Sequence, residues 1–240
     1  MMIYAVADLH LPGGSDKTMD VFGKKWEGHF DRIRASWTEQ VTEDDAVLLP
    51  GDLSWAMRLE DALEDLREIG RLPGKKIILR GNHDYWWGSV TRLREALPEG
   101  MFALQNDAMR LGECAFCGSR GWTHPSEEGA GDDEDRRIYD RELIRLEMSL
   151  EKGKKLGGRL IVMTHYPPLD EKHAHTPMSR LITAYAPSDV VYGHLHGAAL
   201  KGAFNGVRDG IRYHCVSCDG TGFTVRPIGR SGDGSAGLSE

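Results

Sequence analysis

Short apolar runs, separated by longer amphipathic stretches, are the main pattern along this chain. Five of the runs are continuous and rich in aliphatic residues: Met2–Ala7, Ala46–Pro50, Lys76–Arg80, Leu160–Thr164 and Asp189–Tyr192. A strand that is covered on both faces has this pattern, because neither of its faces meets water. The pattern therefore predicts five buried strands.

Two of the intervening stretches have helical spacing. Leu59–Ile69 and Arg136–Leu156 repeat apolar residues at the period of a helix, which predicts one buried face on each. Acidic residues precede the longer stretch and lysines lie at its end, as the helix dipole favours, and Gly157 then ends it. Strands that alternate with helices predict an α/β fold. The apolar face of the longer helix consists of Tyr139, Leu143, Leu146 and Leu150.

Three further segments, 101–118, 211–216 and 222–225, alternate in polarity and predict short antiparallel strands. Together with the five buried strands they predict two stacked mixed β-sheets flanked by helices, a four-layer α/β/β/α sandwich. Residues 1–228 are expected to form one domain. The segment 126–135 is expected to be a solvated loop, and the Gly/Ser-rich segment 229–240 a disordered tail.

Polar residues follow every one of the five buried runs. Because ligands bind at the carboxyl ends of strands in open α/β sheets, these residues should converge in space. Two carboxylates, one amide and four imidazoles suit Mn, Fe, Zn, Ni or Co better than Ca, and the two oxygens of Asp52 can bridge two ions. Glycines 51, 81 and 193 are expected to let the backbone turn tightly. The candidate metal ligands are Asp8, His10, Asp52, Asn82, His165, His194 and His196.

In this order, the motifs DLH, GD, GNHD, H and GHLH resemble those of the calcineurin-like metallophosphoesterase superfamily. Segments 51–57 (GDLSWAM) and 191–197 (VYGHLHG) further resemble a bacterial branch of predicted phosphohydrolases. Trp55 stands where the family often has a second acid, so the signature of the protein phosphatases is absent. The resemblance implies a first metal held by Asp8, His10 and His196, a bridging Asp52, and a second metal held by Asn82, His165 and His194. It also implies that His83 lies near the leaving group and that Asp84 orients His83.

These residues support a concrete chemistry. Two divalent ions bring about +4 against about −2 from two aspartates, so the site should attract phosphate. A hydroxide held between the metals would attack phosphorus, and His83 would protonate the leaving oxygen or stabilise its charge. The sequence therefore predicts a dinuclear metal-dependent hydrolase of phosphomonoesters or phosphodiesters.

Several other residues are candidates for substrate contact. Arg80, Arg120 and Lys172 could bind phosphate. Trp55 could stack on a nucleotide base, together with the aromatic residues 85–87, or these rings could pack against the following helix. Five histidines outside the motifs are expected to be surface or packing residues, although those at 173 and 175, in the loop 169–178, could reach substrate. These five are His29, His124, His173, His175 and His214.

Composition narrows the choice of function. The 240 residues carry a formal net charge of −7, which disfavours nucleic acid as a partner and so a nuclease. A non-catalytic metal-binding scaffold on the same fold is a further alternative, although the complete ligand set argues against it. No apolar run reaches the roughly 18 residues of a membrane span, and the start of the chain lacks the features of a signal peptide. We therefore expect a cytoplasmic location and a small phosphorylated substrate; the sequence does not indicate an oligomeric state.

The four cysteines form two CxxC pairs, Cys114/Cys117 and Cys215/Cys218. Such pairs can bind zinc when they lie on tight turns. Both pairs are expected in strands, however, where positions i and i+3 point to opposite faces. They are therefore interpreted as small core residues.

Overall fold

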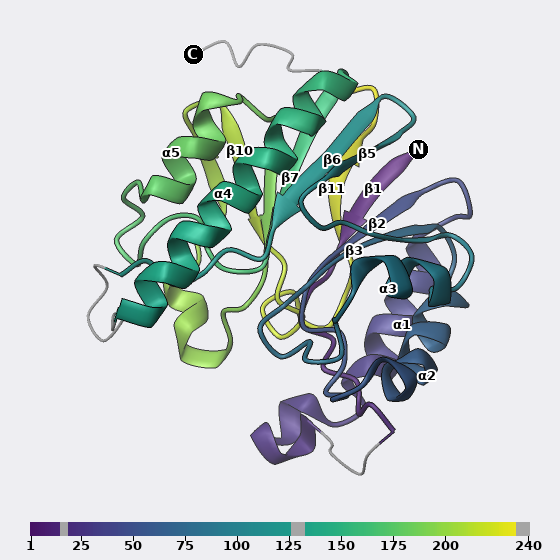
Figure 1. Ribbon diagram of the computed structural model, residues 1–240. Coiled ribbons are helices and arrows are strands. Elements are labelled where there is room, and N and C mark those ends of the chain that lie inside the picture. Colours follow the sequence, from purple (N-terminus) through teal and green to yellow (C-terminus); the bar gives the residue numbers. More distant parts are fainter. Residues whose placement is uncertain (15–18, 126–132, 234–240) are drawn as a thin grey trace.

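Two β-sheets lie face to face in the computed structural model, with helices outside each (Figure 1). The structure describes residues 1–14, 19–125 and 133–233. The first sheet has the order β11-β1-β2-β3-β4 and the second the order β5-β6-β7-β8-β10-β9, and both mix parallel and antiparallel pairs. The predicted four-layer sandwich is confirmed. The strands are β1 Met2–Ala5, β2 Ala46–Pro50, β3 Lys75–Leu79, β4 Met101–Ala103, β5 Ala108–Leu111, β6 Cys114–Ser119, β7 Arg159–Thr164, β8 Asp189–Tyr192, β9 Gly206–Arg208, β10 Ile211–Cys215 and β11 Arg226–Arg230.

The helices form the two outer layers. Helices α1, α2 and α3 lie on the first sheet, and α4 and α5 lie on the second (Figure 1). None of the helices in the described part of the chain is long and apolar enough to cross a membrane. Their bounds are α1 His29–Gln40, α2 Leu59–Gly70, α3 Val90–Ala96, α4 Asp133–Leu156 and α5 Pro177–Ala184, and the short 3-10 helices are η1 Met19–Phe22, η2 Lys24–Trp26 and η3 Gly197–Gly202.

Helix α4 buries the face that its sequence pattern predicted. Tyr139, Leu146 and Leu150 are buried against the second sheet, and Leu143 is half-buried beside them. The helix begins earlier than expected, so residues 133–135 form its acidic first turn and are not part of a loop. The remainder of that expected loop, residues 126–132, lies outside the described residues.

Three apolar layers fill the spaces between the four structural layers. Within β7, Leu160 and Val162 face the helices, whereas Ile161 and Met163 face the first sheet. Side chains alternate along a strand, so a strand between two apolar layers must be apolar at every position. The continuous runs in the sequence have this cause.

The first run ends differently from the prediction. β1 stops at Ala5, and Ala7 pairs instead with the segment that follows β10. The Ala7 amide donates to the Val216 carbonyl at 2.8 Å, and the Cys218 amide donates to the Ala7 carbonyl at 3.1 Å. The chain thus crosses from the first sheet to the second immediately before Asp8, which places this carboxylate where the two sheets meet.

Four other sequence predictions need correction or qualification. β4 pairs parallel to β3, although β5 and β6 are antiparallel as expected. The expected strand at 222–225 is absent from the described chain there; the strand lies at Arg226–Arg230 and pairs with the free edge of β1. Residues 229 and 230, expected in a disordered tail, belong to this strand, and residues 234–240 lie outside the described part. Of the cysteines, Cys218 lies in a turn after β10 and not in a strand.

The cysteines are four free, buried thiols. Cys114 faces the layer between the sheets and Cys117 faces α4, so this pair points to opposite sides of β6 as predicted. The Cys218 thiol donates to the Asp8 carbonyl at 3.0 Å. The cysteines therefore serve packing and local hydrogen bonding.

Candidate metal centre

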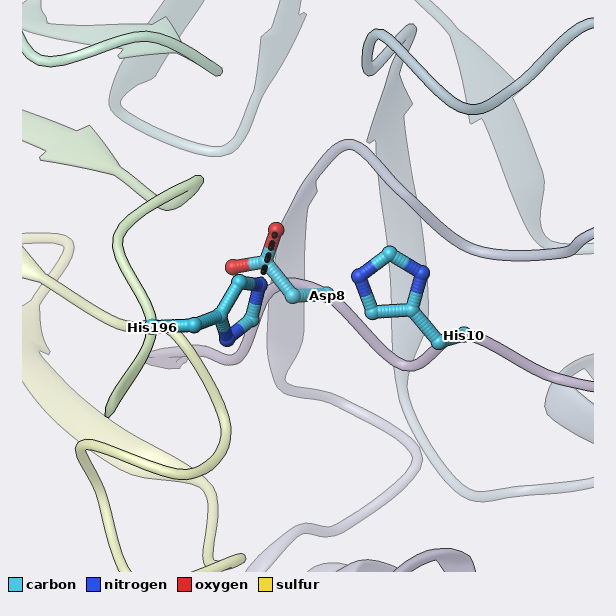
Figure 2. Close-up of side chains that lie close together, drawn as sticks. All are labelled: Asp8, His10 and His196. Carbon is cyan, nitrogen blue, oxygen red and sulfur yellow. Dashed lines mark ion pairs between the residues drawn. The ribbon is translucent and has the colours of Figure 1, made fainter. Parts of the chain in front are cut away.

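The carboxyl ends of β1, β2, β3, β7 and β8 meet at one point between the sheets. Among the described residues, two groups of side chains could hold a metal ion, with all ligand atoms of a group within 4.8 Å of one another. One group is Asp8, His10 and His196, and the other is Asp8, Asp52 and His165. Figure 2 shows the first group, with the Asp8 carboxylate beside the His196 imidazole and His10 on the other side of Asp8.

The backbone is strained at this point. Asp8, His10, Asp52 and His194 have φ values of 62°, 46°, 54° and 73°, in the left-handed region that non-glycine residues rarely adopt. Such strain costs of order 1–3 kcal/mol per residue and clusters at functional sites. The rest of the fold offsets this cost, and the strained conformation directs these side chains toward one another.

The three motif glycines allow close approach. Only Gly51 has a positive φ, 97°, as a tight turn requires. At Gly81 an added Cβ would collide with the Asp52 carboxylate, and at Gly193 it would lie 2.6 Å from Oδ2 of Asp8. These two glycines do not have the positive φ of Gly51, and their lack of a side chain leaves room for the two carboxylates.

The first cluster consists of Asp8, His10 and His196. Nε2 of His196 lies 3.7 Å from Oδ1 of Asp8, and Nε2 of His10 lies 3.7 Å from Oδ2 of Asp52. Nδ1 of His10 and Nε2 of His196 are buried without a hydrogen-bond partner among the described residues. The Trp55 indole stacks on His10, with ring centroids 4.7 Å apart.

Sequence reasoning missed Asp219. Its Oδ1 accepts from Nδ1 of His196 at 2.8 Å, while its Oδ2 accepts from Lys25 Nζ at 2.7 Å and from the Gly197 amide at 3.0 Å. A carboxylate in this position fixes which ring nitrogen carries the proton and leaves the other free for a metal. Asp219 lies four residues after β10, whose alternating sequence did not mark it as one of the doubly buried strands from which the other ligands were predicted.

The second cluster consists of Asn82, His165 and His194. Oδ1 of Asn82 lies 2.6 Å from Nε2 of His165 and 2.9 Å from Nδ1 of His194, and the two nitrogens are 3.3 Å apart. His165 donates Nδ1–H to the Pro50 carbonyl at 2.9 Å, which leaves Nε2 as the atom that faces Asn82 and, at 3.5 Å, Oδ2 of Asp52.

The two clusters fit divalent transition metals. Imidazole nitrogens mixed with carboxylate and amide oxygens suit these ions. Two ligand atoms that each lie about 2.1 Å from one ion are roughly 3–3.5 Å apart. The spacings of 3.5–3.7 Å around the two aspartates are close to that value. The buried ring nitrogens without hydrogen-bond partners among the described residues are available to coordinate a cation.

The two carboxylates titrate in opposite directions. Burial raises the pKa of Asp52 to about 8, and the charge of Asp8 adds to this effect. Burial also opposes the charge on Asp8, yet the surrounding histidines, His196 first, hold its pKa well below the usual range. Burial opposes the charge on His196, but Asp219 and then Asp8 raise its pKa to about 10. Burial lowers the pKa values of His10 and His194 to about 3. A bound cation would replace the protons that this metal-free cluster retains.

Asp84, for which the resemblance implied a role in orienting His83, accepts hydrogen bonds from two ligand-bearing loops. Its Oδ2 accepts from the amides of Asp52 and Gly81 at 2.8 and 2.7 Å, and its Oδ1 accepts from the Leu53 amide and the Trp86 indole at 2.9 and 3.1 Å. None of these hydrogen bonds between described residues comes from the ring of His83. Asp84 therefore joins the two loops that carry Asp52 and Asn82, and burial raises its pKa to about 6.

His83 lies at the edge of the first cluster. Its amide donates to Oδ1 of Asp52 at 2.8 Å, and its ring centroid lies 4.5 Å from Trp55 and 5.6 Å from His10. Of the other aromatic candidates, Trp86 and Trp87 are buried in the apolar layer between the first sheet and its helices, as the packing interpretation expected, while Tyr85 is exposed. Trp55 is the candidate aromatic residue that contacts the ligand cluster.

The three candidate phosphate contacts differ in position. Arg80 and Arg120 line one cavity of about 80 Å³. Arg80 directly precedes the GNHD loop in sequence, and Arg120 directly follows β6. Within the described chain Arg80 makes no side-chain hydrogen bond or ion pair, and Arg120 lies 3.7 Å from Glu142. Lys172 is on an exposed turn and is brought to neither cavity wall nor ligand cluster.

Four of the five histidines outside the motifs have hydrogen-bond partners that are not candidate ligands, although the partner of His29 lies between Asp8 and His10. They bond the Leu9 carbonyl (His29, 2.8 Å), the Gly202 carbonyl (His173, 3.1 Å), Asp209 (His175, 2.8 Å) and Asp189 (His214, 3.0 Å). His124 packs edge-on against Tyr139 and also lines a cavity of about 500 Å³ beside His194.

Comparison with known proteins agrees with this centre. The family model of the calcineurin-like phosphoesterases matches residues 1–198, which include all seven candidate ligands, and the chain belongs to this family. It is accordingly a metal-dependent phosphoesterase. Asp219 lies beyond the matched segment.

Solved structures show the same fold at low sequence identity. Phosphopantetheinyl hydrolase (PptH) from Mycobacterium tuberculosis is 14% identical, with a TM-score of 0.55 over 95% of each chain. GAP50, the anchor in the inner membrane complex of Plasmodium, is 12% identical, with a TM-score of 0.51 over 90% of this chain and 71% of that one. No curated protein sequence matches the chain.

Proposed function

We propose that this protein hydrolyses small phosphomonoesters or phosphodiesters at a two-cation centre. The observation that carries the proposal is the convergence of seven metal-binding side chains from five strand ends, with the Asp8 and Asp52 carboxylates among the imidazoles. Asp8, His10 and His196 hold one cation; Asn82, His165 and His194 hold the other; and Asp52 lies within 3.7 Å of a histidine of each cluster.

The cations, when bound, supply Lewis acidity, which activates water at neutral pH and neutralises charge on a phosphoryl group. The chain contributes the geometry. The strained backbone at Asp8 and Asp52 positions both carboxylates before substrate arrives, and the hydrogen bonds that the Asp52 and Gly81 amides donate to Asp84 hold the Asp52 loop in place. Arg80, whose guanidinium lacks an ion-pair partner among the described residues, and Arg120 bind phosphoryl oxygens.

His83 is the proposed proton donor to the leaving oxygen. Its position is supported by the hydrogen bond from its backbone N–H to the Asp52 carboxylate. The ring contacts with His10 and Trp55 also hold the imidazole at the edge of the centre. A positioned acid of this kind contributes about 10²–10⁴-fold to the rate.

Metal analysis combined with a substrate panel tests the proposal. Purified protein should take up about two equivalents of divalent transition metal. The loaded protein should hydrolyse p-nitrophenyl phosphate or bis(p-nitrophenyl) phosphate with Mn²⁺. The name of the M. tuberculosis neighbour motivates a phosphopantetheinyl ester as a further panel member. Protein that binds no metal, or that binds metal and cleaves no ester across several metals, contradicts the proposed function.

A further inference from the structure

A cavity of about 500 Å³ opens directly beside the second ligand cluster. It lies between the segment that follows β7 and helix η3. His194 belongs to both the cluster and the cavity wall, and Tyr166 packs on His194 with ring centroids 4.1 Å apart. A group bound in this cavity is therefore adjacent to the candidate ligands.

The wall of the cavity suits an uncharged organic group. Pro167, Leu169, Leu195, Ala198 and Ala199 supply apolar surface. The Tyr166 hydroxyl makes no hydrogen bond to the described residues, so it is available to a bound group as a donor and an acceptor. Pockets for small molecules typically measure about 300–1,000 Å³ and are mainly apolar with a few polar groups.

The charges on the wall disfavour an anionic group. Asp170 and Glu171 line the cavity against a single lysine, Lys201, so these three side chains together carry a charge of −1. The Asp170 carboxylate is fixed by the amides of Lys172 and Ala174, at 2.9 and 2.7 Å. A polyphosphate chain or a nucleic-acid strand would therefore meet two acidic side chains and one basic one.

We propose that this cavity binds the alcohol portion of the phosphate ester and selects a sizeable, uncharged organic group. The inference rests on the proposed function, because it assigns the cavity to the part of the substrate that is not attacked. The phosphoryl group lies at the ligand clusters, the ester oxygen is within reach of His83, and the organic group extends past His194 onto Tyr166 and the apolar wall.

Two esters and one bulky substitution test the size preference. The Mn²⁺-loaded wild-type protein should have a kcat/KM at least about tenfold higher for 1-naphthyl phosphate than for methyl phosphate after correction for leaving-group acidity. Ala199→Trp, which fills the cavity, should reduce kcat/KM for the naphthyl ester at least about tenfold more than for the methyl ester. Val207→Trp places the same indole side chain on the exposed edge strand β9 and should leave both values as in wild type. Equal losses for the two esters in Ala199→Trp overturn the proposal.

A charge reversal provides a second test that does not threaten folding, because Glu171 is exposed. Wild type should prefer phenyl phosphate over 4-carboxyphenyl phosphate, and Glu171→Lys should reduce this preference severalfold. An unchanged preference argues against the cavity.

Calorimetric titration of Mn²⁺-loaded protein with 1-naphthyl phosphate separates this inference from the proposed function. Binding that Ala199→Trp weakens, without hydrolysis by wild type, supports the cavity and contradicts the enzyme. Hydrolysis of both esters with no discrimination in any variant supports the enzyme and overturns the cavity.

Discussion

The two halves of the candidate metal centre are spaced differently and anchored differently. In the first cluster, a histidine nitrogen lies 3.7 Å from each aspartate, and one histidine is oriented by a second side chain, Asp219. In the second, Asn82, His165 and His194 lie 2.6–3.3 Å from one another, and His165 is oriented by the backbone carbonyl of Pro50.

This difference predicts two kinds of behaviour. Spacings near 3.7 Å admit a cation with little rearrangement, whereas atoms 2.6 Å apart must spread before they can share one. A side-chain anchor can be removed by one substitution, while a backbone carbonyl remains in every variant. Metal binding in the first half should therefore be the more sensitive to substitutions of residues outside its ligands. Asp52 reaches both halves, so its substitution should have the largest effect on metal binding.

Asp52→Ala should have the largest effect, because it removes the carboxylate shared by the two clusters. We expect turnover to fall at least about 10³-fold, since several kcal/mol of charge stabilisation are lost and each 1.36 kcal/mol is tenfold in rate. Metal content should fall below two equivalents. Steady-state kinetics and elemental analysis measure both, and a variant that retains full metal content would show that Asp52 does not link the halves.

His83→Ala should lower turnover about 10²–10³-fold while both halves keep their metal. The ring lies beside the first cluster without belonging to either metal-binding group. His214→Ala is the matched control, because that histidine bonds Asp189 outside both the centre and the cavity. Loss of metal from His83→Ala would make His83 a ligand and not a proton donor.

Asp219→Asn should weaken the first half alone. Removal of a carboxylate that orients a metal-binding histidine typically costs about 10–100-fold in metal affinity. A Mn²⁺ titration should show one weakened and one unchanged site. Asp209→Asn, which alters the partner of His175, should leave both sites unchanged. Equal weakening of both sites would remove the distinction between the two anchors.

Gly81→Ala should destabilise the fold and displace Asp52. The added methyl would collide with the Asp52 carboxylate, and overpacking of this kind costs about 1–3 kcal/mol. At Gly88, seven residues further on, an added methyl meets nothing within 4 Å, so Gly88→Ala is the control. The free energy of unfolding in urea distinguishes them, and equal stability would mean that the Asp52 loop relaxes freely.

The stability of metal-free protein should depend on pH through Asp52. Its folded-state pKa of about 8 lies above the ordinary value of 3.8, so the folded state holds this proton more tightly than the unfolded state. The resulting stabilisation is complete below about pH 4 and disappears as pH rises through 8. The unfolding free energy of wild type should therefore fall relative to that of Asp52→Asn between pH 5 and 8. A constant difference over this range would contradict the raised pKa.

The sequence by itself determined the layered fold and the candidate ligands. Apolar runs without alternation indicated doubly covered strands, and the residue after each run could be assigned to one edge, because carboxyl ends of such strands converge. Local periodicity carries this information. The same periodicity did not predict where strands end. It did not reveal that β1 stops at Ala5 or that the last strand begins at Arg226.

Only the tertiary structure decided how the ligands are held and what lies beside them. Three features depend on segments that are distant in sequence or belong to different sheets. They are the hydrogen bonds between Asp84 and the Asp52 loop, the hydrogen bond between Asp219 and His196, and the cavity next to His194. Spacing along the chain fixes which face a side chain occupies, but not which other segment comes to meet it. That depends on how the two sheets stack, and therefore on the packing of the whole core.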